Sequence, residues 1–356
     1  MNVRDGRSRG GLRREFLKVC AGVAALAFPQ RAAFADEQNW QIFKRRFIER
    51  GERVVDTGNN DISHSESQGW GMLFAESNGD KETFQKLWEW TSKTLQRGDG
   101  LFSWRWSPKA AEPVADKNNA ADGDILIAWA LARAAKRWAE PRWAAQSKTI
   151  QGAVLSQLTV ELQGRLILLP GVQGFARGER RVVNLSYYVW SAIHDFAGSV
   201  GEQGRWRRLE TDGFWLLDNS SFGTYRLPPD WLLVGNQEFK IADGWPPYFG
   251  FDAVRIPLYL AWRNEQARLG RFLSAWQTPQ FGGKPPAWIN LKDGSVAPFP
   301  SSGGYEAVLA LTQFVSDGML TKPPFAVLTD ADDYYSASLK LLSNIAVQEA
   351  PLAKRT

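Results

Sequence analysis

Three short segments of the chain place carboxyl groups where they could carry out acid–base chemistry. Glu66 lies where the polar stretch 63–68 leads into an apolar segment. Asp122 and Asp124 stand one residue apart at the start of a second apolar segment, and Asp252 precedes a third. One protonated and one ionised carboxyl group can together donate a proton to a leaving group and withdraw a proton from water. These acids are therefore candidates for general acid–base catalysis.

Each of these acids also has a purely structural interpretation. Ser63 with Glu66, or Ser65 with Gln68, could form a capping box that satisfies free amides at a helix start. The two acids of the second segment would be stabilised by the dipole at a helix N-terminus. Asp252 could cap a helix and pair with the arginine three positions later. Taken singly, the acids leave catalysis and helix capping open.

The inventory of reactive residues excludes several other chemistries. The chain has two histidines and a single cysteine, too few for a zinc site built from nitrogen and sulfur ligands. Neither histidine lies in a G-x-S-x-G context, and no glycine-rich phosphate-binding loop is present. Asp330, Asp332 and Asp333 lack the glycine and closing glutamate of a calcium loop, so we interpret them as acids at a helix N-terminus. We expect no metal and no other cofactor.

Residues 1–35 have the features of an export signal. A basic stretch is followed by the ten-residue apolar run 19–28 and the small-residue site 33–35. This run is shorter than the roughly 20 residues of a membrane-spanning helix, so no membrane insertion is expected. Arg13 and Arg14, with the Glu-Phe-Leu-Lys that follows, resemble the twin-arginine motif; the alternative is an ordinary secretory signal. We expect a periplasmic or secreted protein with one domain over 36–356.

The charge of the chain gives no reason to expect a nucleic-acid partner. The leader holds seven basic and two acidic residues, and the whole chain holds 43 and 38. The remaining residues therefore carry 36 charges of each sign. This balance leaves no excess of basic residues of the kind that binds nucleic acid.

The elements that must position the acids are mostly helices. Apolar residues at i, i+3, i+4, i+7 and i+11 form one stripe, made of Phe84, Leu87, Trp88, Thr91 and Leu95. Similar patterns predict helices at 39–50, 66–77, 80–97, 124–138, 141–160, 186–198, 204–217, 253–268, 270–277, 304–316 and 332–345. Segments 165–170 and 180–184 are expected to form a small hairpin or ribbon. The sequence therefore predicts an all-α domain with few strands and helices around a closed core.

The order and spacing of the three acidic segments resemble family 8 of the glycoside hydrolases. Members of this family carry S-E-G-Q, then A-[ST]-D-G-D, then a D-A-x-R-x-P stretch, which correspond here to 65–68, 120–124 and 252–257. Segments 184–187 and 229–231 add to the similarity. Within the family the chain looks most like the periplasmic endo-1,4-β-glucanases that accompany bacterial cellulose synthases.

The resemblance implies a fold and a reaction. The fold would be an (α/α)6 barrel with six inner and six outer helices, and the reaction would be hydrolysis of a β-1,4-glucan with inversion. Glu66 corresponds to the general acid and Asp252 to the base, with Asp122 bonding the distorted sugar and Asp124 supporting it. Inverting enzymes hold acid and base roughly 6.5 to 9.5 Å apart, which leaves room for water.

The neighbours of the acids suggest further roles. Arg255, one turn from Asp252, would bind substrate and keep the Asp252 carboxylate ionised. An apolar environment would raise the pKa of Glu66. Tyr187 is a candidate for orienting the water. Exposed aromatic rings stack on sugars, and the candidates in glycine- and proline-flanked segments are Trp104, Trp106 and Trp231.

The chain departs from the family pattern at Ser67, Ala121, Leu185 and Phe251, where Gly, Ser or Thr, Pro and Tyr are usual. These changes remove no carboxylate. Alternatives therefore stay open: a chitosanase or xylanase of the same family, a polysaccharide lyase, or a catalytically weak glucan-binding component of a secretion system. A monomer that works with the cellulose synthase machinery is expected from the resemblance.

Overall fold

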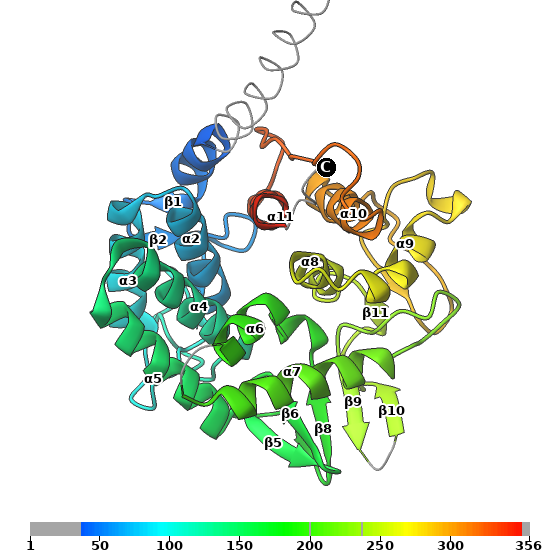
Figure 1. Cartoon of the computed structure of the whole chain (residues 1–356), viewed down its shortest axis with the longest axis horizontal. Coiled ribbons are helices and arrows are strands. Elements are labelled where there is room, and N and C mark those ends of the chain that lie inside the picture. The colour runs from blue at the N-terminus through cyan, green and yellow to red at the C-terminus, as the bar shows by residue number, and fades with distance from the viewer. Residues whose placement is uncertain (1–36, 199–200, 236–237, 351–356) are drawn as a thin grey trace, which may run out of the picture.

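A computed structural model describes residues 37–198, 201–235 and 238–350, so the expected export signal lies outside the described residues. These residues contain eleven α-helices connected by short strands and loops (Figure 1). The helices are 37–47, α2 (Ser65–Ser77), α3 (Lys81–Leu95), α4 (Ala121–Trp138), α5 (Pro141–Gln157), α6 (Trp190–Gly198), α7 (Gln203–Asp218), α8 (Arg255–Trp262), α9 (Gly270–Trp276), α10 (Gly303–Ser316) and α11 (Tyr334–Glu349).

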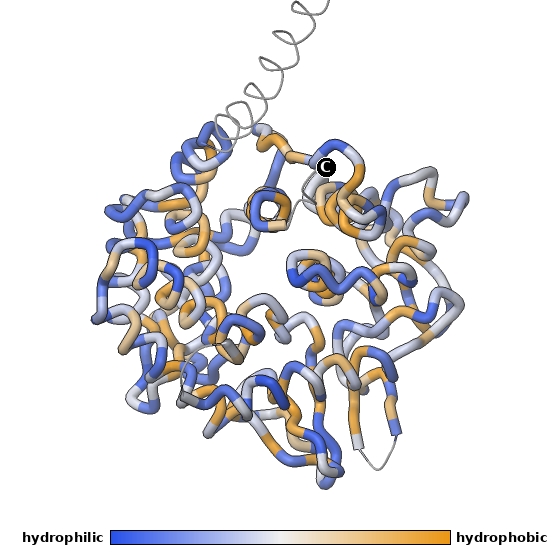
Figure 2. The backbone as a smooth tube through the Cα atoms, viewed as in Figure 1, coloured by the Kyte–Doolittle hydropathy of each residue, from blue (hydrophilic) through white to orange (hydrophobic). Residues whose placement is uncertain are grey.

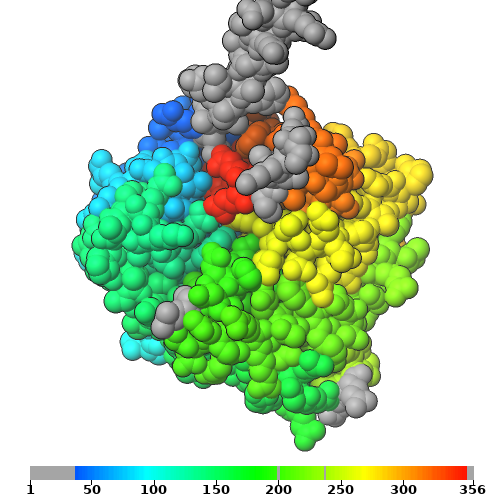
Figure 3. Space-filling view, in the orientation of Figure 1, coloured from blue at the N-terminus to red at the C-terminus, as the bar shows by residue number. Residues whose placement is uncertain are grey.

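Six of these helices form a closed inner ring. Contacts join α2 to α4, α4 to α6, α6 to α8, α8 to α10, α10 to α11, and α11 back to α2. Side chains fill the space that the ribbons leave open in the middle of the ring (Figure 3). The fold is an (α/α)6 barrel, which confirms the predicted class.

The outer layer of the described residues holds five helices, where the resemblance implied six. They are 37–47, α3, α5, α7 and α9, whereas the segment 317–333 between α10 and α11 has no helix. Pro323 and Pro324 lie in this segment, and a proline removes a backbone donor and disfavours helical conformation before it. Gly318 and Met319 also have positive φ angles of 68° and 61°. An extended segment therefore takes the place of the sixth outer helix.

Hydrophobic periodicity explains how the helices pack. The buried residues of α3 are the five of the predicted stripe. Hydrophobic stretches lie along the ring helices and hydrophilic ones along much of the outer surface (Figure 2). Several predicted helices are longer than the observed ones; for example, Thr159 begins a strand after α5, and Asn264 has a φ of 61° just after α8. No helix in residues 37–198, 201–235 or 238–350 is both long enough and apolar enough to cross a bilayer.

Short antiparallel strands occupy the connections. The pairs are β1 (Ile48–Glu49) with β2 (Arg53–Val54), β3 (Ser63–His64) with β4 (Arg105–Trp106), β5 (Thr159–Leu162) with β6 (Arg165–Leu168), and β11 (Tyr248–Phe249) with β12 (Ile289–Asn290). A four-stranded sheet has the order β10 (Glu238–Ile241), β9 (Leu232–Gly235), β8 (Arg180–Val183) and β7 (Ala176–Arg177). The two predicted strand segments are β6 and β8, but they do not pair with each other, so the expected hairpin is wrong.

Candidate active site

The N-terminal ends of the ring helices meet at one end of the barrel. A glycine permits the close approach of α4 to α2, because a Cβ on Gly123 of α4 would lie 2.1 Å from Ser65 Oγ at the start of α2. The starts of α10 and α11 are joined by the hydrogen bond from Gly304 N to Ser336 Oγ, 2.9 Å. Helix N-termini carry partial positive charge and free amides, so this end of the barrel favours acidic side chains.

Arg255, the first residue of α8, brings together all three predicted catalytic acids. Its Nη1 contacts Glu66 Oε1 and lies 3.1 Å from Asp122 Oδ2. Its Nη2 lies 2.7 Å from Asp252 Oδ1 and donates to Ser186 Oγ at 3.0 Å. Sequence reasoning selected the acids separately, and the structure places them around one guanidinium.

The charge balance of this cluster favours retained protons. One cation faces three carboxyl groups, and the side chain of Arg255 is only 4% exposed. Carboxyl groups that share a site disfavour each other's ionised form. An acid that keeps its proton is the requirement for protonating a leaving group.

Burial raises the pKa of Asp122 to about 7, against the opposing effects of a hydrogen bond from the Gly123 amide and the nearby His64. Asp122 Oδ1 accepts this bond at 2.8 Å, and Oδ2 faces the Arg255 guanidinium. Below about pH 7 the Asp122 carboxyl is therefore largely protonated and can donate a hydrogen bond.

The pKa of Asp252 is raised well above its ordinary value, first by burial and then by Asp230 and Asp122. The predicted ion pair with Arg255 is present, yet it does not hold the pKa of Asp252 low. Burial and the carboxyl groups of Asp230 and Asp122 outweigh Arg255, whose guanidinium also contacts Glu66 and Asp122. The prediction that Arg255 keeps the Asp252 carboxylate ionised is therefore not confirmed.

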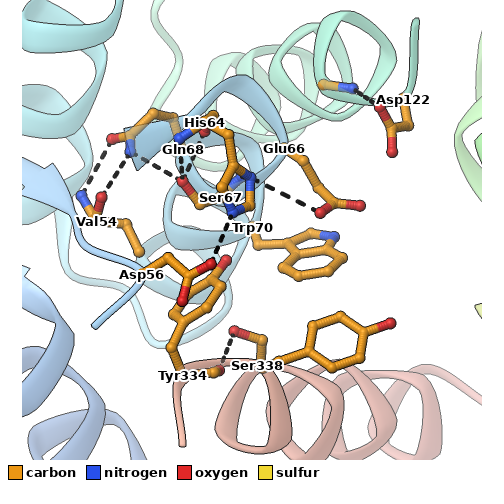
Figure 4. Close-up of polar contacts among 12 residues, drawn as sticks. Val54, Asp56, His64, Glu66, Ser67, Gln68, Trp70, Asp122, Tyr334 and Ser338 are labelled. Atoms are coloured by element: carbon orange, nitrogen blue, oxygen red, sulfur yellow. Dashed lines mark hydrogen bonds and ion pairs between the residues drawn. The ribbon is translucent and has the colours of Figure 1, made fainter. Parts of the chain in front are cut away.

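The start of α2 is capped in a register that the sequence did not indicate (Figure 4). His64 is the N-cap: its Nδ1 accepts from Ser67 N at 3.1 Å, and Ser67 Oγ accepts from His64 N at 3.1 Å. Both predicted capping boxes are wrong, and Glu66 takes no part in the observed one. Ser67 is fully buried and also donates to the His64 carbonyl, so the residue that replaces the usual Gly does not enter the cleft.

The other acids are not caps either. Helix α4 begins after Ala120, which makes no side-chain cap, and α8 begins after Val254, which makes none. The structure therefore removes the capping interpretation for Asp122 and for Asp252. By contrast, Asp333 does cap α11 by accepting from Ser336 N at 2.6 Å, as predicted for the acids near that helix.

Asp124 lies beneath the site and does not face it. Its side chain is fully buried, with Oδ1 accepting from Phe102 N at 2.8 Å and Oδ2 from Asn119 Nδ2 at 2.6 Å. Burial raises its pKa well above the ordinary value. Both carboxyl oxygens of Asp124 are occupied, so Asp124 can act on a bound sugar only through the supporting role that we expected. Its hydrogen bonds tie α4 to the loop before it.

The three predicted stacking tryptophans have different environments. Trp104 is half-buried, and its carbonyl accepts from Ser65 N at 3.0 Å beside Glu66. Trp106 packs edge-on against Trp90 at 5.7 Å and carries the Arg53 guanidinium over its ring at 4.6 Å. One face of the Trp106 ring is therefore covered, which makes Trp106 less available for stacking on a sugar.

Trp231 belongs to the wall beside Asp252. Its ring is stacked on Trp245 at 4.8 Å and meets the edge of Tyr187 at 6.0 Å. Its indole is also hydrogen-bonded to the Asp252 carboxylate and lowers the pKa of that group. Tyr187 ends the short helix Leu185–Tyr187 and lies 5.7 Å from the Arg255 guanidinium. Tyr187 and Trp231 therefore contact each other near Asp252 and Arg255, and one ring face of Trp231 is already covered by Trp245.

A cleft of about 600 Å³ opens beside these acids and contains residues that sequence reasoning missed. It is lined by Glu66, Asp252 and Arg255 together with Phe251 and Phe299. The two phenylalanines are 51% and 49% exposed. Phe299 has no motif around it, so only its position in the structure reveals it.

His64 and Asp56 also line the cleft next to Glu66. His64 Nδ1 is 3.8 Å from Glu66 Oε2, and its Nε2 is 3.8 Å from Asp56 Oδ2 (Figure 4). Because Nδ1 accepts from Ser67 N, the proton of the neutral imidazole lies on Nε2. This side chain therefore borders the acid, and we had not selected it.

The family model described as glycosyl hydrolases family 8 matches residues 16–349. The chain belongs to this family. A probable endoglucanase from Novacetimonas hansenii is 43% identical over 338 residues, covering 93% of this chain and 96% of the relative. An endoglucanase structure from Klebsiella pneumoniae has a TM-score of 0.82 at 42% identity and covers 88% and 99% of the two chains. An endo-β-1,4-glucanase from Acetobacter xylinum has a TM-score of 0.81 at 41% identity, with coverages of 88% and 98%.

Membership in family 8 makes the chain a glycoside hydrolase. The predicted recognition of this family from its three acidic segments is confirmed. The polysaccharide lyase alternative is wrong.

Proposed function

We propose that the protein is an endo-β-1,4-glucanase in which Glu66 is the general acid and Asp252 the general base. The observation that carries this proposal is the gathering of Glu66, Asp122 and Asp252 around Arg255 at the N-terminal ends of the ring helices. Relatives named endoglucanases at 41–43% identity support the glucan as substrate.

The reaction follows from the positions of the groups. Protonated Glu66 donates its proton to the glycosidic oxygen as the bond from that oxygen to the anomeric carbon breaks. Asp252 removes a proton from a water molecule, whose oxygen forms the new bond to the anomeric carbon. Asp122, protonated below about pH 7, donates a hydrogen bond to a hydroxyl of the distorted sugar.

The remaining residues bind and orient. Arg255 holds the three acids, and Tyr187 orients the water near Asp252. Glucosyl rings stack on Trp104 and on the exposed rings of Phe251 and Phe299, because the apolar face of a sugar packs well against an aromatic ring.

The substrate is tested by parallel assays of reducing-sugar release. We expect hydrolysis of carboxymethylcellulose and lichenan, and much slower hydrolysis of xylan and chitosan. The chitosanases of this family place the base elsewhere, so an Asp at 252 favours a glucan. A faster rate on xylan or chitosan than on both glucans would contradict the proposal, and binding without turnover would favour a glucan-binding component.

We further propose that residues 1–35 direct export by the twin-arginine route, leaving 36–356 as the catalytic domain. The mature protein would act as a periplasmic or secreted monomer alongside a cellulose synthase.

The export proposal predicts that changing both Arg13 and Arg14 to Lys abolishes delivery to the periplasm. The change preserves the charge of the leader, which an ordinary secretory route tolerates and a twin-arginine route does not. The measurement is enzyme activity in periplasmic and cytoplasmic fractions. Normal periplasmic activity of the double-lysine variant would show that the twin-arginine interpretation is wrong.

A further inference from the structure

Asp230 holds the turn that carries the proposed base. Its Oδ1 accepts hydrogen bonds from Gly250 N at 3.0 Å and from Ala253 N at 2.7 Å. Its own amide donates to the Tyr248 carbonyl at 2.7 Å. These contacts lie on both sides of Asp252, so the position of Asp252 depends on the carboxylate of Asp230.

Asp230 differs from the other acids in its partners. Glu66, Asp122 and Asp252 all contact the Arg255 guanidinium, whereas Asp230 is bound by backbone amides. Burial raises the pKa of Asp230 to about 6, and the Ala253 and Gly250 amides oppose that rise. Asp230 therefore adds a further carboxyl group that acts on Asp252 and whose hydrogen bonds come from backbone amides, not from Arg255.

We propose that Asp230 is a positioning residue for the base, which fixes the 250–253 turn and offsets with its charge the attraction of Asp252 to Arg255. This inference rests on the proposed role of Asp252. Arg255 stabilises the ionised form of Asp252 and so makes it a weaker base. Asp230 acts in the opposite direction, which keeps Asp252 able to accept a proton from water.

Other charged and titratable groups face Asp252 from the elements around it. They are Asp122 of α4, Tyr187 before α6, Arg255 of α8, Tyr305 of α10 and Tyr335 of α11. After burial, Asp230 is the largest contribution that raises the pKa of Asp252. Two carboxyl groups that interact electrostatically titrate as a pair, and removing one charge lets the other ionise at lower pH.

The test is the pH profile of kcat/KM on carboxymethylcellulose for Asp230→Asn. Asparagine keeps an oxygen that accepts from the Gly250 and Ala253 amides, but it carries no charge. The base must be ionised, so the acid limb of the profile reports its pKa. We expect this limb to move to lower pH by about one unit. The plateau should stay within about tenfold of the wild-type value, because a weaker base slows the reaction only moderately.

Two further variants separate the effect of the hydrogen bonds to the Gly250 and Ala253 amides from the effect of the charge. Asp230→Ala removes the hydrogen bonds and the charge, and should lose more plateau activity than Asp230→Asn. Asp212→Asn is the matched control, because Asp212 is a buried acid that accepts from Leu166 N at 2.8 Å. Its acid limb should match the wild type. Far-UV circular dichroism and the melting temperature report whether each variant is folded.

An unmoved acid limb in folded Asp230→Asn, or a limb moved to higher pH, would overturn the proposal. A loss of kcat/KM in Asp230→Asn that is as large at every pH as the loss in Asp252→Asn would also overturn the proposal, since Asp230 would then itself be the base. Failure of the proposed function is distinguishable from these results. In that case the wild type would not hydrolyse glucan, or Asp252→Asn would keep its activity.

Discussion

Glu66→Gln and Asp252→Asn are each expected to lower the rate of glucan hydrolysis by about 10² to 10⁴-fold. Glutamine cannot supply a proton to the glycosidic oxygen, and asparagine cannot accept one from water. The measurement is the initial rate of reducing-sugar release from carboxymethylcellulose. Affinity for a cello-oligosaccharide, measured by calorimetry, should change little because both substitutions preserve side-chain shape.

The structure provides a matched control on the same helix. Glu76 lies at the opposite end of α2, is 5% exposed, and binds Arg133 at 2.8 Å. Glu76→Gln should reduce stability and leave the turnover of the folded protein near the wild-type value. Near-normal turnover of Glu66→Gln would show that Glu66 is not the acid.

The two substitutions should also be non-additive. Acid and base act in one step, so the double variant is expected to lose far less than the product of the two single losses. Losses that multiply would indicate that the two groups act in separate steps.

The helical framework could be predicted from sequence because it depends on local periodicity. The stripe of α3 is buried as expected, and the acids lie at the starts of α2 and α4. The cap of α2 was missed because His64 acts through an imidazole nitrogen, which is not among the side chains that commonly cap helices. Local patterns therefore found the helices but not the details of their ends.

The roles of several site residues depend on contacts between distant segments. Trp106 has its ring covered by Arg53, and Asp124 is buried under a loop. Asp230 reaches the turn at 250–253 across 20 residues of chain. Asp124 and Asp230 lie within segments that resemble the family and Trp106 lies outside them. In all three cases nothing in the neighbouring sequence distinguishes a buried side chain from an exposed one. The sequence could therefore select acids that the structure brings together around Arg255, but it could not assign their surroundings.

The arrangement around Arg255 also bears on stereochemistry. Glu66 and Asp122 contact Nη1 of Arg255, while Asp252 binds Nη2. A retaining site needs a nucleophile carboxylate about 5 to 5.5 Å from the acid, and an inverting site needs a wider gap. Asp122 shares Nη1 with Glu66, but its side chain is only 3% exposed, against 29% for Asp252, and Asp252 lines the cleft where a water molecule can reach it. Asp252, on the other nitrogen, is the better candidate to act through water.

We therefore expect hydrolysis of a β-1,4-glucan to give the α-anomer as the first product. In this mechanism water attacks the face opposite the leaving oxygen, and no covalent glycosyl-enzyme forms. Proton NMR of the anomeric signals in the first minutes, before mutarotation, measures the outcome directly. Intact-mass spectra of the quenched reaction should show the unmodified protein. Initial appearance of the β-anomer together with a glycosyl adduct would contradict inversion, and Asp122 would then be the residue to test as the nucleophile, because it shares the guanidinium nitrogen with Glu66.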